Sequence, residues 1–276
     1  MALTIHDNAG TQVRILPEKG ATVVSFLRNG IEFLYRNEEN LTSPERPRCG
    51  IPFLFPIFGR LQDGVYRWAG KQYAMEIHGF GHTSVWDVVE HTADTAVLRL
   101  TANAETMSVY PFRFQVTLTF RICQGTLEII QCYKNLDEIA MPYNFGFHPY
   151  FRVDALEHAR VETTAQVHFD YSVGKPQPFG HGEVTVSIPQ GAPEAGAAFM
   201  GVTAPTVLHI PAEGRKITME YTEDFPQLVL WTQAGKRFLC AEPINGTPNG
   251  LNTGEYRTLQ PSEQYITTLR ICAETI

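Results

Sequence analysis

The sequence contains no uninterrupted apolar run of about 18 residues, the length that a membrane-spanning helix requires. Its first residues, MALTIHDNAGTQV, lack the charged and apolar regions of a secretory signal. Basic residues are in the minority, with 22 Lys and Arg against 29 Asp and Glu and a formal net charge of −7. These absences argue against a membrane span and against a nucleic-acid or anionic-membrane surface, both of which need basic patches. A cytoplasmic location is expected.

Paired-cysteine motifs are also missing. The five cysteines are scattered and show no CxxC or CxxH spacing, which excludes the usual zinc patterns. An odd, scattered set is typical of reduced thiols in a cytoplasm, where most buried cysteines act as small core residues. No metal ligand is predicted. The positions are Cys49, Cys123, Cys132, Cys240 and Cys272.

Alternation with a period of two is the dominant pattern. In FRFQVTLTFRI, apolar residues from Phe112 to Ile122 alternate with polar ones, as in a strand with one buried face. The same pattern recurs in AVLRLTA, TLEIIQCYKN, ARVETTAQVHF, GEVTVSI, KITMEYT, QLVLWTQ and QYITTLRI. FLRNGIEFLYR predicts a hairpin, because Asn29-Gly30 supplies the positive φ angles of a tight primed turn.

Helical signals are scarce. We expect one short helix in APEAGAAFMGVTA (192–204) and one helical turn in NEENLTSP (37–44). Strands at short spacing from end to end predict an all-β fold, a large antiparallel β-sandwich with few short helices. No stretch resembles a linker and no repeat is visible, so residues 1–276 are expected to form a single domain.

Three stretches break the strand pattern. GIPFLFPIFGR is too rich in proline for a central strand and is expected to be an irregular aromatic segment that ends on Arg60. It is followed by HGFGH, where glycines on both sides of Phe80 permit a sharp turn beside His78 and His82. The second stretch, PYNFGFHPYF, surrounds His148 with aromatic rings, whose faces suit the C–H faces of a sugar.

The third stretch, LCAEPINGTPNGLN, ends a strand with Glu242-Pro243 and opens into a loop rich in glycine and asparagine. Pro243 restricts Glu242 to extended geometry, which holds its carboxylate in place as a candidate general base. Taken singly, each residue has a structural explanation that is more common: a core histidine, a surface arginine, a rim aromatic such as Trp231 in WTQ.

Taken together, GIPFLFPIFGR, HGFGH, NFGFHPYF and LCAEP, in this order, resemble the aldose 1-epimerase (galactose mutarotase-like) family over about residues 48–250. The resemblance implies a galactose mutarotase-like supersandwich and the interconversion of the α and β anomers of an aldose. It implies that Glu242 is the general base, His148 the general acid and His78 a second histidine that binds and polarises the sugar. Arg60 corresponds to an arginine that binds ring hydroxyls, and Asn144 begins the histidine motif. Asn144 and the aromatic Trp231 are further substrate-binding candidates. The reaction that the resemblance implies requires no cofactor.

Some features depart from the galactose-preferring branch and favour the shorter bacterial relatives. That branch carries an aspartate that grips sugar hydroxyls; Asp170 and Asp224 lie in the interval, but neither is in a matching motif. Relatives that act on hexose 6-phosphates need a basic cluster, for which Arg48, Arg60 and Lys236 are candidates. A non-catalytic sugar-binding protein of the same fold, a glycoside hydrolase or lyase, and a structural module stay open as alternatives. A small sugar is the expected partner, and a monomer or weak homodimer the expected state.

Overall fold

The computed structural model describes residues 1–43, 45–170, 175–180, 182–203 and 205–276. Every strand pair formed by these residues is antiparallel, and the sheets are large. The α-helices of the described residues are three short ones: α1 (Glu38–Thr42), α2 (Ala104–Val109) and α3 (Gly250–Thr253). The prediction of a large antiparallel β-sandwich with few short helices is confirmed.

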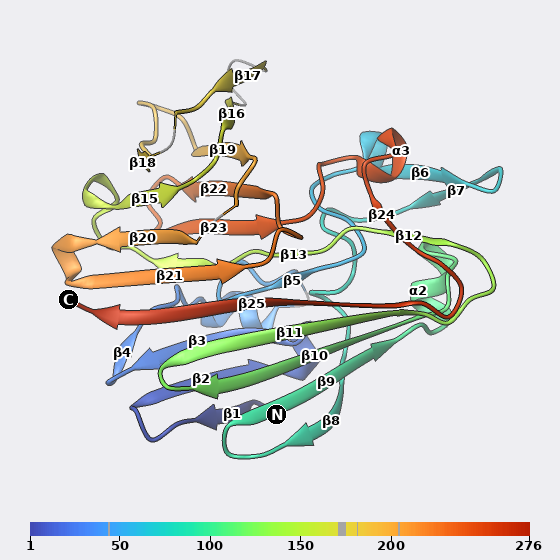
Figure 1. The fold of residues 1–276 in the computed structure, drawn as a ribbon, viewed down its shortest axis with the longest axis horizontal. Coiled ribbons are helices and arrows are strands. Elements are labelled where there is room, and N and C mark those ends of the chain that lie inside the picture. The colour runs from blue at the N-terminus through green and yellow to red at the C-terminus, as the bar shows by residue number, and fades with distance from the viewer. Residues whose placement is uncertain (44, 171–174, 181, 204) are drawn as a thin grey trace.

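The largest sheet has nine strands and runs from top to bottom of Figure 1. Its long central strands alternate buried and less buried residues, as the sequence predicted for FRFQVTLTFRI, where Phe112 to Ile122 place the apolar set in the core. In spatial order the strands are β18 (Gly182–Val184), β15 (Arg160–Thr163), β20 (Thr206–Ile210), β21 (Arg215–Tyr221), β25 (Gln264–Thr275), β11 (Thr126–Asn135), β10 (Phe114–Cys123), β9 (Thr95–Thr101) and β8 (Asp87–His91).

A second sheet of eight strands carries the segments with candidate site residues. Its strands are β17 (Lys175–Pro178), β16 (Val167–Asp170), β19 (Glu194–Met200), β22 (Gln227–Gln233), β23 (Phe238–Ile244), β13 (Gly146–Phe147) and β5 (Phe53–Leu54), with β14 (Tyr150–Arg152) also paired to β23. The proline-rich segment contributes only the two residues of β5, in agreement with its predicted irregularity.

A four-stranded sheet and two ribbons complete the described strands. They are β1 (Leu3–His6), β2 (Thr11–Leu16), β3 (Thr22–Arg28) and β4 (Ile31–Glu32), then β6 (Val65–Trp68) with β7 (Lys71–Ala74), and β12 (Met141–Tyr143) with β24 (Arg257–Leu259). Short 3-10 turns lie at Pro17–Lys19, Gln62–Gly64, Leu156–His158 and Pro211–Glu213. The predicted hairpin at Asn29-Gly30 is confirmed between β3 and β4, with φ of 50° and 80° at the two residues.

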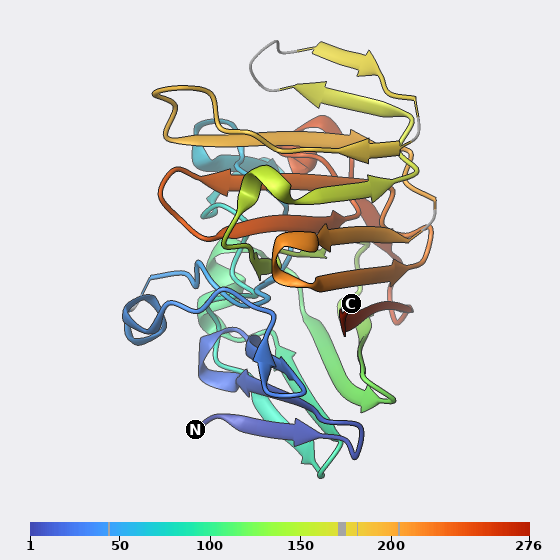
Figure 2. The same cartoon turned by 90° about the vertical axis from the view of Figure 1, so that its left-hand side faces the viewer.

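One buried hydrophobic cluster joins the sheets. It takes residues from Ile5 in β1 to Ala273 in β25 and includes the inner faces of the nine-stranded, eight-stranded and four-stranded sheets. The views in Figure 1 and Figure 2 show these sheets stacked, with the C-terminus at the end of β25. The three larger sheets therefore share one continuous core.

The predicted helix in APEAGAAFMGVTA is wrong. Glu194–Met200 form strand β19, which pairs along its whole length with β22. The run is rich in alanine, a strong helix former, but helix propensity is a weak preference that tertiary pairing overrides. A Cβ on Gly196 would lie 3.1 Å from Cδ1 of Trp231, so the small residue leaves room for the indole on the facing strand. Residue 204 lies outside the described residues.

The predicted helical turn at 37–44 is confirmed as α1, whose first turn is capped by the side chain of Asn37; residue 44 lies outside the described residues. All five cysteines have free thiols. None of the helices formed by the described residues has the length and apolar character needed to cross a membrane.

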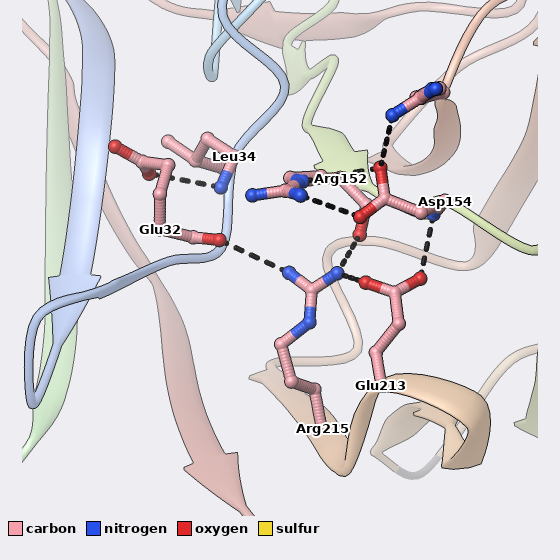
Figure 3. Close-up of polar contacts among 7 residues, drawn as sticks. Glu32, Leu34, Arg152, Asp154, Glu213 and Arg215 are labelled. Atoms are coloured by element: carbon pink, nitrogen blue, oxygen red, sulfur yellow. Dashed lines mark hydrogen bonds and ion pairs between the residues drawn. The ribbon is translucent and has the colours of Figure 1, made fainter.

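A buried arginine connects three of these elements. Arg215 is 3% exposed, and its guanidinium donates to the backbone carbonyls of Glu32 in β4 and Arg152 in β14 at 3.1 and 3.0 Å. The same group pairs with the carboxylate of Glu213, which also accepts the N–H of Asp154 (Figure 3). This clamp ties β4, β14 and β21 together, directly beside the segment that carries His148.

Candidate active site

Strand β23 carries Glu242 on the face turned away from the central core. Leu239 and Ala241 point into that core, so the alternating residues Cys240 and Glu242 share the opposite face. Glu242 lies directly across from Val229 in β22 and is 2% exposed. A carboxylate in this position is held rigidly and almost fully out of water.

His148 lies between β13 and β14, where its backbone N–H donates to the carbonyl of Pro52 at 3.0 Å. Its ring stacks on Tyr150 with centroids 4.6 Å apart and an interplanar angle of 6°. The edge of Trp231 approaches the same ring at 5.9 Å. These aromatic contacts fix the orientation of the imidazole, which stays 9% exposed.

The structure brings Glu242 and His148 together. Oε1 of Glu242 lies 3.4 Å from Nε2 of His148, although the two residues are far apart in the sequence. Burial raises the pKa of Glu242 well above its usual range, an effect that the nearby charge of Arg46 opposes. Burial, together with the charge of Arg46, lowers the pKa of His148 to about 3. Both shifts favour the neutral form of the pair, a protonated carboxyl group on Glu242 beside a neutral imidazole on His148.

His78 completes the group. Its ring lies 5.5 Å from that of His148, and its Nδ1 accepts the backbone N–H of Gly59 at 3.1 Å. Burial and the neighbouring His148 lower the pKa of His78 well below its usual value, so the ring is neutral. Because Nδ1 is an acceptor, the proton of the neutral ring is on Nε2, which makes His78 a hydrogen-bond donor.

Three arginines lie at one side of these residues. Arg46, Arg48 and Arg60 line a hollow of about 370 Å³ together with His82, whose ring is 6.3 Å from that of His78. Burial and the charge of Arg48 lower the pKa of the half-buried Arg46. The sequence predicted Arg60 and Arg48 but missed Arg46; its signal is the R-P-R run that precedes the proline-rich segment.

Lys236, the third residue proposed for a basic cluster, lies in the turn between β22 and β23. Glu242 is near the other end of β23, about 20 Å away at the usual rise of a strand. The structure therefore groups Arg46, and not Lys236, with Arg48 and Arg60.

Asn144 is 1% exposed and lies beneath the loop that follows β23. Its Nδ2 donates to the carbonyl of Glu255 at 3.1 Å, and its backbone N–H donates to that of Pro56 at 2.8 Å. A Cβ on Gly246 would lie 2.4 Å from Cγ of Asn144, so the loop packs directly on this amide. The geometry favours a positioning role for Asn144 over contact with a sugar.

Of the two aspartates in the interval, the structure describes the side chain of Asp224 alone. Asp224 accepts hydrogen bonds from Thr222, Arg257 and Tyr265, and it anchors β24 and β25. The backbone of Asp170 ends β16, and its side chain lies outside what the structure describes. Trp231, in contrast, lies beside His148 and also lines a hollow of about 710 Å³ with Val229 and Gly196.

Comparison with known proteins gives the context of this geometry. Residues 1–272 match the family model described as aldose 1-epimerase. The chain belongs to the aldose 1-epimerase family. This agrees with the resemblance of its motifs and with the arrangement of its sheets.

Relatives of the aldose 1-epimerase family resemble the chain over most of its length. Protein LacX of Lactococcus lactis subsp. lactis is 24% identical over 263 residues, which cover 82% of each chain. The structure of the Slr1438 protein from Synechocystis sp. PCC 6803 superposes with a TM-score of 0.92 at 28% identity and covers 100% of this chain and 96% of that one. A galactose mutarotase-like protein from Lactobacillus casei ATCC 334 shares the fold, with a TM-score of 0.85 at 21% identity over 99% and 100% of the two chains.

Proposed function

We propose that the protein is an aldose 1-epimerase that interconverts the α and β anomers of an aldose. The observation that carries the proposal is the 3.4 Å approach of Glu242 Oε1 and His148 Nε2, at a site that is bordered by aromatic rings. One carboxyl and one imidazole within a sugar's width of each other are suited to moving two protons at neighbouring atoms of a ring.

In the proposed reaction, Glu242 takes the proton of the C1 hydroxyl while His148 protonates the ring oxygen, so that the C1–O5 bond opens to the aldehyde. Rotation about C1–C2 presents the other face of the carbonyl, and the same two groups then run in reverse. In this scheme the Nε2–H of His78 donates to a sugar oxygen, and Arg60 binds hydroxyls. Each acid or base group typically contributes about 10² to 10⁴-fold in rate.

The single proton of the pair fits this scheme. The neutral form of the Glu242–His148 pair is favoured, with the proton on the carboxyl group of Glu242. Its transfer to His148 yields the carboxylate and imidazolium that the reaction uses and leaves the net charge of the pair unchanged. Arg46 acts on both partners: its positive charge favours the carboxylate of Glu242 and disfavours the imidazolium of His148.

The test is polarimetry of freshly dissolved α-glucose or α-galactose. Glu242→Gln and His148→Asn are expected to lose at least about 100-fold in rate, the lower end of an acid–base contribution, while sugar binding is retained. The matched controls are Glu157→Gln and His158→Asn, which change an exposed carboxylate and an exposed imidazole and are expected to keep full activity. A near-wild-type rate in Glu242→Gln or His148→Asn contradicts the assigned roles.

Saturable sugar binding by the wild type without any acceleration of anomer exchange would favour the non-catalytic alternative. Hydrolysis calls for two carboxylates that flank one bond. Here the partner of Glu242 is an imidazole, and release of a chromophore from aryl glycosides would be needed to revive the hydrolase alternative.

A second candidate, favoured by the arginines, is mutarotation of an aldose 6-phosphate. No ion pair holds Arg46, Arg48 or Arg60 among the described residues, although Glu45 and Glu76 also line the hollow. The charges of Arg48 and Arg60 add to burial in lowering the pKa of the half-buried Arg46. A phosphate in the 370 Å³ hollow would bring negative charge to the three arginines, and arginine suits its geometry.

The two candidates separate in one assay. Mutarotation rates are measured for glucose and glucose 6-phosphate with the wild type and Arg46→Gln. If phosphate is recognised, kcat/KM is higher for the phosphorylated sugar, and Arg46→Gln lowers kcat/KM more for glucose 6-phosphate than for glucose. Equal values for both sugars in the wild type rule out the phosphate candidate. A cytoplasmic location and a monomeric or weakly dimeric state complete the proposal, and the five free thiols support the former.

A further inference from the structure

We propose that His148, Cys240 and Glu242 form a binding site for Zn²⁺, and that occupation of this site reversibly switches the enzyme off. Binding of the ion stands on the geometry of the three side chains alone. Only the loss of activity rests on the proposed function of Glu242 and His148. Nothing in the sequence indicated this site, because its ligands come from two distant segments and Cys240 has no CxxC or CxxH partner.

The three side chains lie almost close enough to bind one metal ion together. Cys240 and Glu242 are alternate residues of β23 and lie on the same face, and His148 reaches this face from the segment before β14. The thiol sulfur, a ring nitrogen and a carboxylate oxygen all lie within 4.8 Å of one another. Ligand atoms on one Zn²⁺ are about 3.5 Å apart, given bonds of about 2.0–2.3 Å. Side-chain shifts of about 1 Å therefore suffice.

The chemistry of the three side chains suits zinc. Thiolate, imidazole and carboxylate are its usual ligands, and three of them leave a fourth position open for water. Two negative ligands cancel the two positive charges of the ion, so a site in which all three residues are at least nine-tenths buried holds no net charge.

His148 has the freedom that such a ligand needs. Its Nδ1 is buried and has no hydrogen-bond partner among the described residues, so no contact of that atom fixes the tautomer. His78 does not qualify as the fourth ligand in its present form, because its Nδ1 accepts from Gly59 and its Nε2 therefore carries the proton. The fourth position stays open.

Binding is balanced by proton release. Zn²⁺ binds the thiolate of Cys240, the carboxylate of Glu242 and the neutral imidazole of His148, so any proton that these ligand atoms hold passes to the buffer. With a carboxylate oxygen and an imidazole nitrogen bonded to the ion, neither group is available for transfer of a proton to or from a sugar. Removal of the ion with EDTA restores both.

The first experiment measures the site without reference to activity. Co²⁺, which takes the same ligands and is coloured, is titrated into the wild type, Cys240→Ala and the control Cys123→Ser, which changes an exposed thiol. The wild type and Cys123→Ser are expected to bind one Co²⁺ with a near-ultraviolet sulfur-to-cobalt band, which Zn²⁺ abolishes. Cys240→Ala is expected to lack the band. A wild type without the band, or a band that survives in Cys240→Ala, overturns the proposal.

The second experiment measures mutarotation with added ZnCl₂. The wild type is expected to lose more than nine-tenths of its rate and to recover it with EDTA. Cys240→Ala is expected to have the same rate as the wild type without metal, and to need at least tenfold more Zn²⁺ for the same loss. Cys240→Ser, nearly isosteric, replaces the alanine variant if the latter does not fold. A cobalt band in a protein without mutarotase activity would contradict the proposed function and support the metal site. Equal sensitivity of wild type and both Cys240 variants to Zn²⁺ overturns the switch.

Discussion

At the scale of single residues, burial sets the proton affinities of the site. It is the largest cause of the pKa shifts of His78, His82, His148 and Glu242, and it disfavours the charged form in every case. Neighbouring charges add to or oppose these shifts, and the charge of Arg46 lowers the pKa of all four groups. Glu242 and His148 are both neutral until a proton moves from the carboxyl group to the imidazole, which suits them to proton transfer. Burial of two such groups lowers the stability of the fold.

That cost can be measured for Glu242. Its folded-state pKa is raised above the unfolded value of about 4.5, so the folded protein binds more protons than the unfolded chain above that pH. Wild-type stability therefore falls as the pH rises through this range, and a neutral amide avoids the loss. Glu242→Gln is expected to be more stable than the wild type at pH 8, with the difference vanishing near pH 4, as measured by urea unfolding. A less stable variant at pH 8 would contradict the assignment.

His82 makes the opposite contribution. Burial and the charge of Arg46 lower its pKa to about 3, while the unfolded value is about 6.5. Its neutral ring contributes full stability above pH 6.5, which is lost progressively as the pH falls toward 3. His82→Gln is expected to reduce the pH dependence of the unfolding free energy in this range by about one proton, or about 1.4 kcal/mol per pH unit. Urea unfolding at pH 4, 5 and 6 is the measurement, with the exposed His158→Gln as control. Identical slopes would show that His82 is protonated in the folded state.

The sequence located some of these residues and not others for a physical reason. Glu242, His148 and His78 lie in segments whose prolines and glycines interrupt strands, so local composition marks them. Arg46 and Cys240 lie in or beside such segments too, but no pattern in the sequence assigns an arginine or a cysteine there to the site. Their place at the site follows from how β23 and the segment before the proline-rich stretch pack, which is information that only the tertiary structure contains.

At the scale of elements, regular alternation was predictable and small residues were misleading. Strands β10 and β11 coincide closely with their alternating segments, because one face of each is in the core. β19 did not show the pattern, since its alanines and Gly196 carry too little side chain to distinguish two faces. ARVETTAQVHF, a continuous run in the sequence, is divided between β15 and β16, which belong to different sheets.

The Arg215 clamp provides a prediction at this scale. Arg215→Met removes the cation that pairs with Glu213 and leaves the carbonyls of Glu32 and Arg152 without that donor. The expected loss of stability is about 3–5 kcal/mol, typical of breaking a buried ion pair. Arg160→Met, which breaks an exposed pair with Glu183, is the matched control and is expected to cost at most about 1 kcal/mol. If the two changes lower the free energy of unfolding equally, as measured with urea, the buried clamp stabilises the protein no more than an exposed ion pair does.

At the scale of the whole molecule, the order of strands in space departs from their order in sequence. β25, the last strand, lies near the middle of the nine-stranded sheet, between β21 and β11. No local pattern in QYITTLRI reveals this position, since alternation shows that a strand has a buried face but not which strands it pairs with. The fold class was therefore predictable from composition and periodicity, and the topology was not.

The central place of β25 leads to a prediction about folding. Deletion of residues 264–276 removes hydrogen-bonding partners from both β21 and β11 and exposes the core that Leu269, Ile271 and Ala273 cover. The truncated chain is expected to show no cooperative unfolding transition by circular dichroism, because β25 is the strand that joins the two halves of this sheet among the described residues. Deletion of Ile276 alone, which is 70% exposed and donates one backbone hydrogen bond to Gly214, is expected to cost at most about 1 kcal/mol. A cooperative transition in the longer truncation would mean that the β18–β21 and β8–β11 parts of the sheet are stabilised independently, each by its own packing against the sheets behind it.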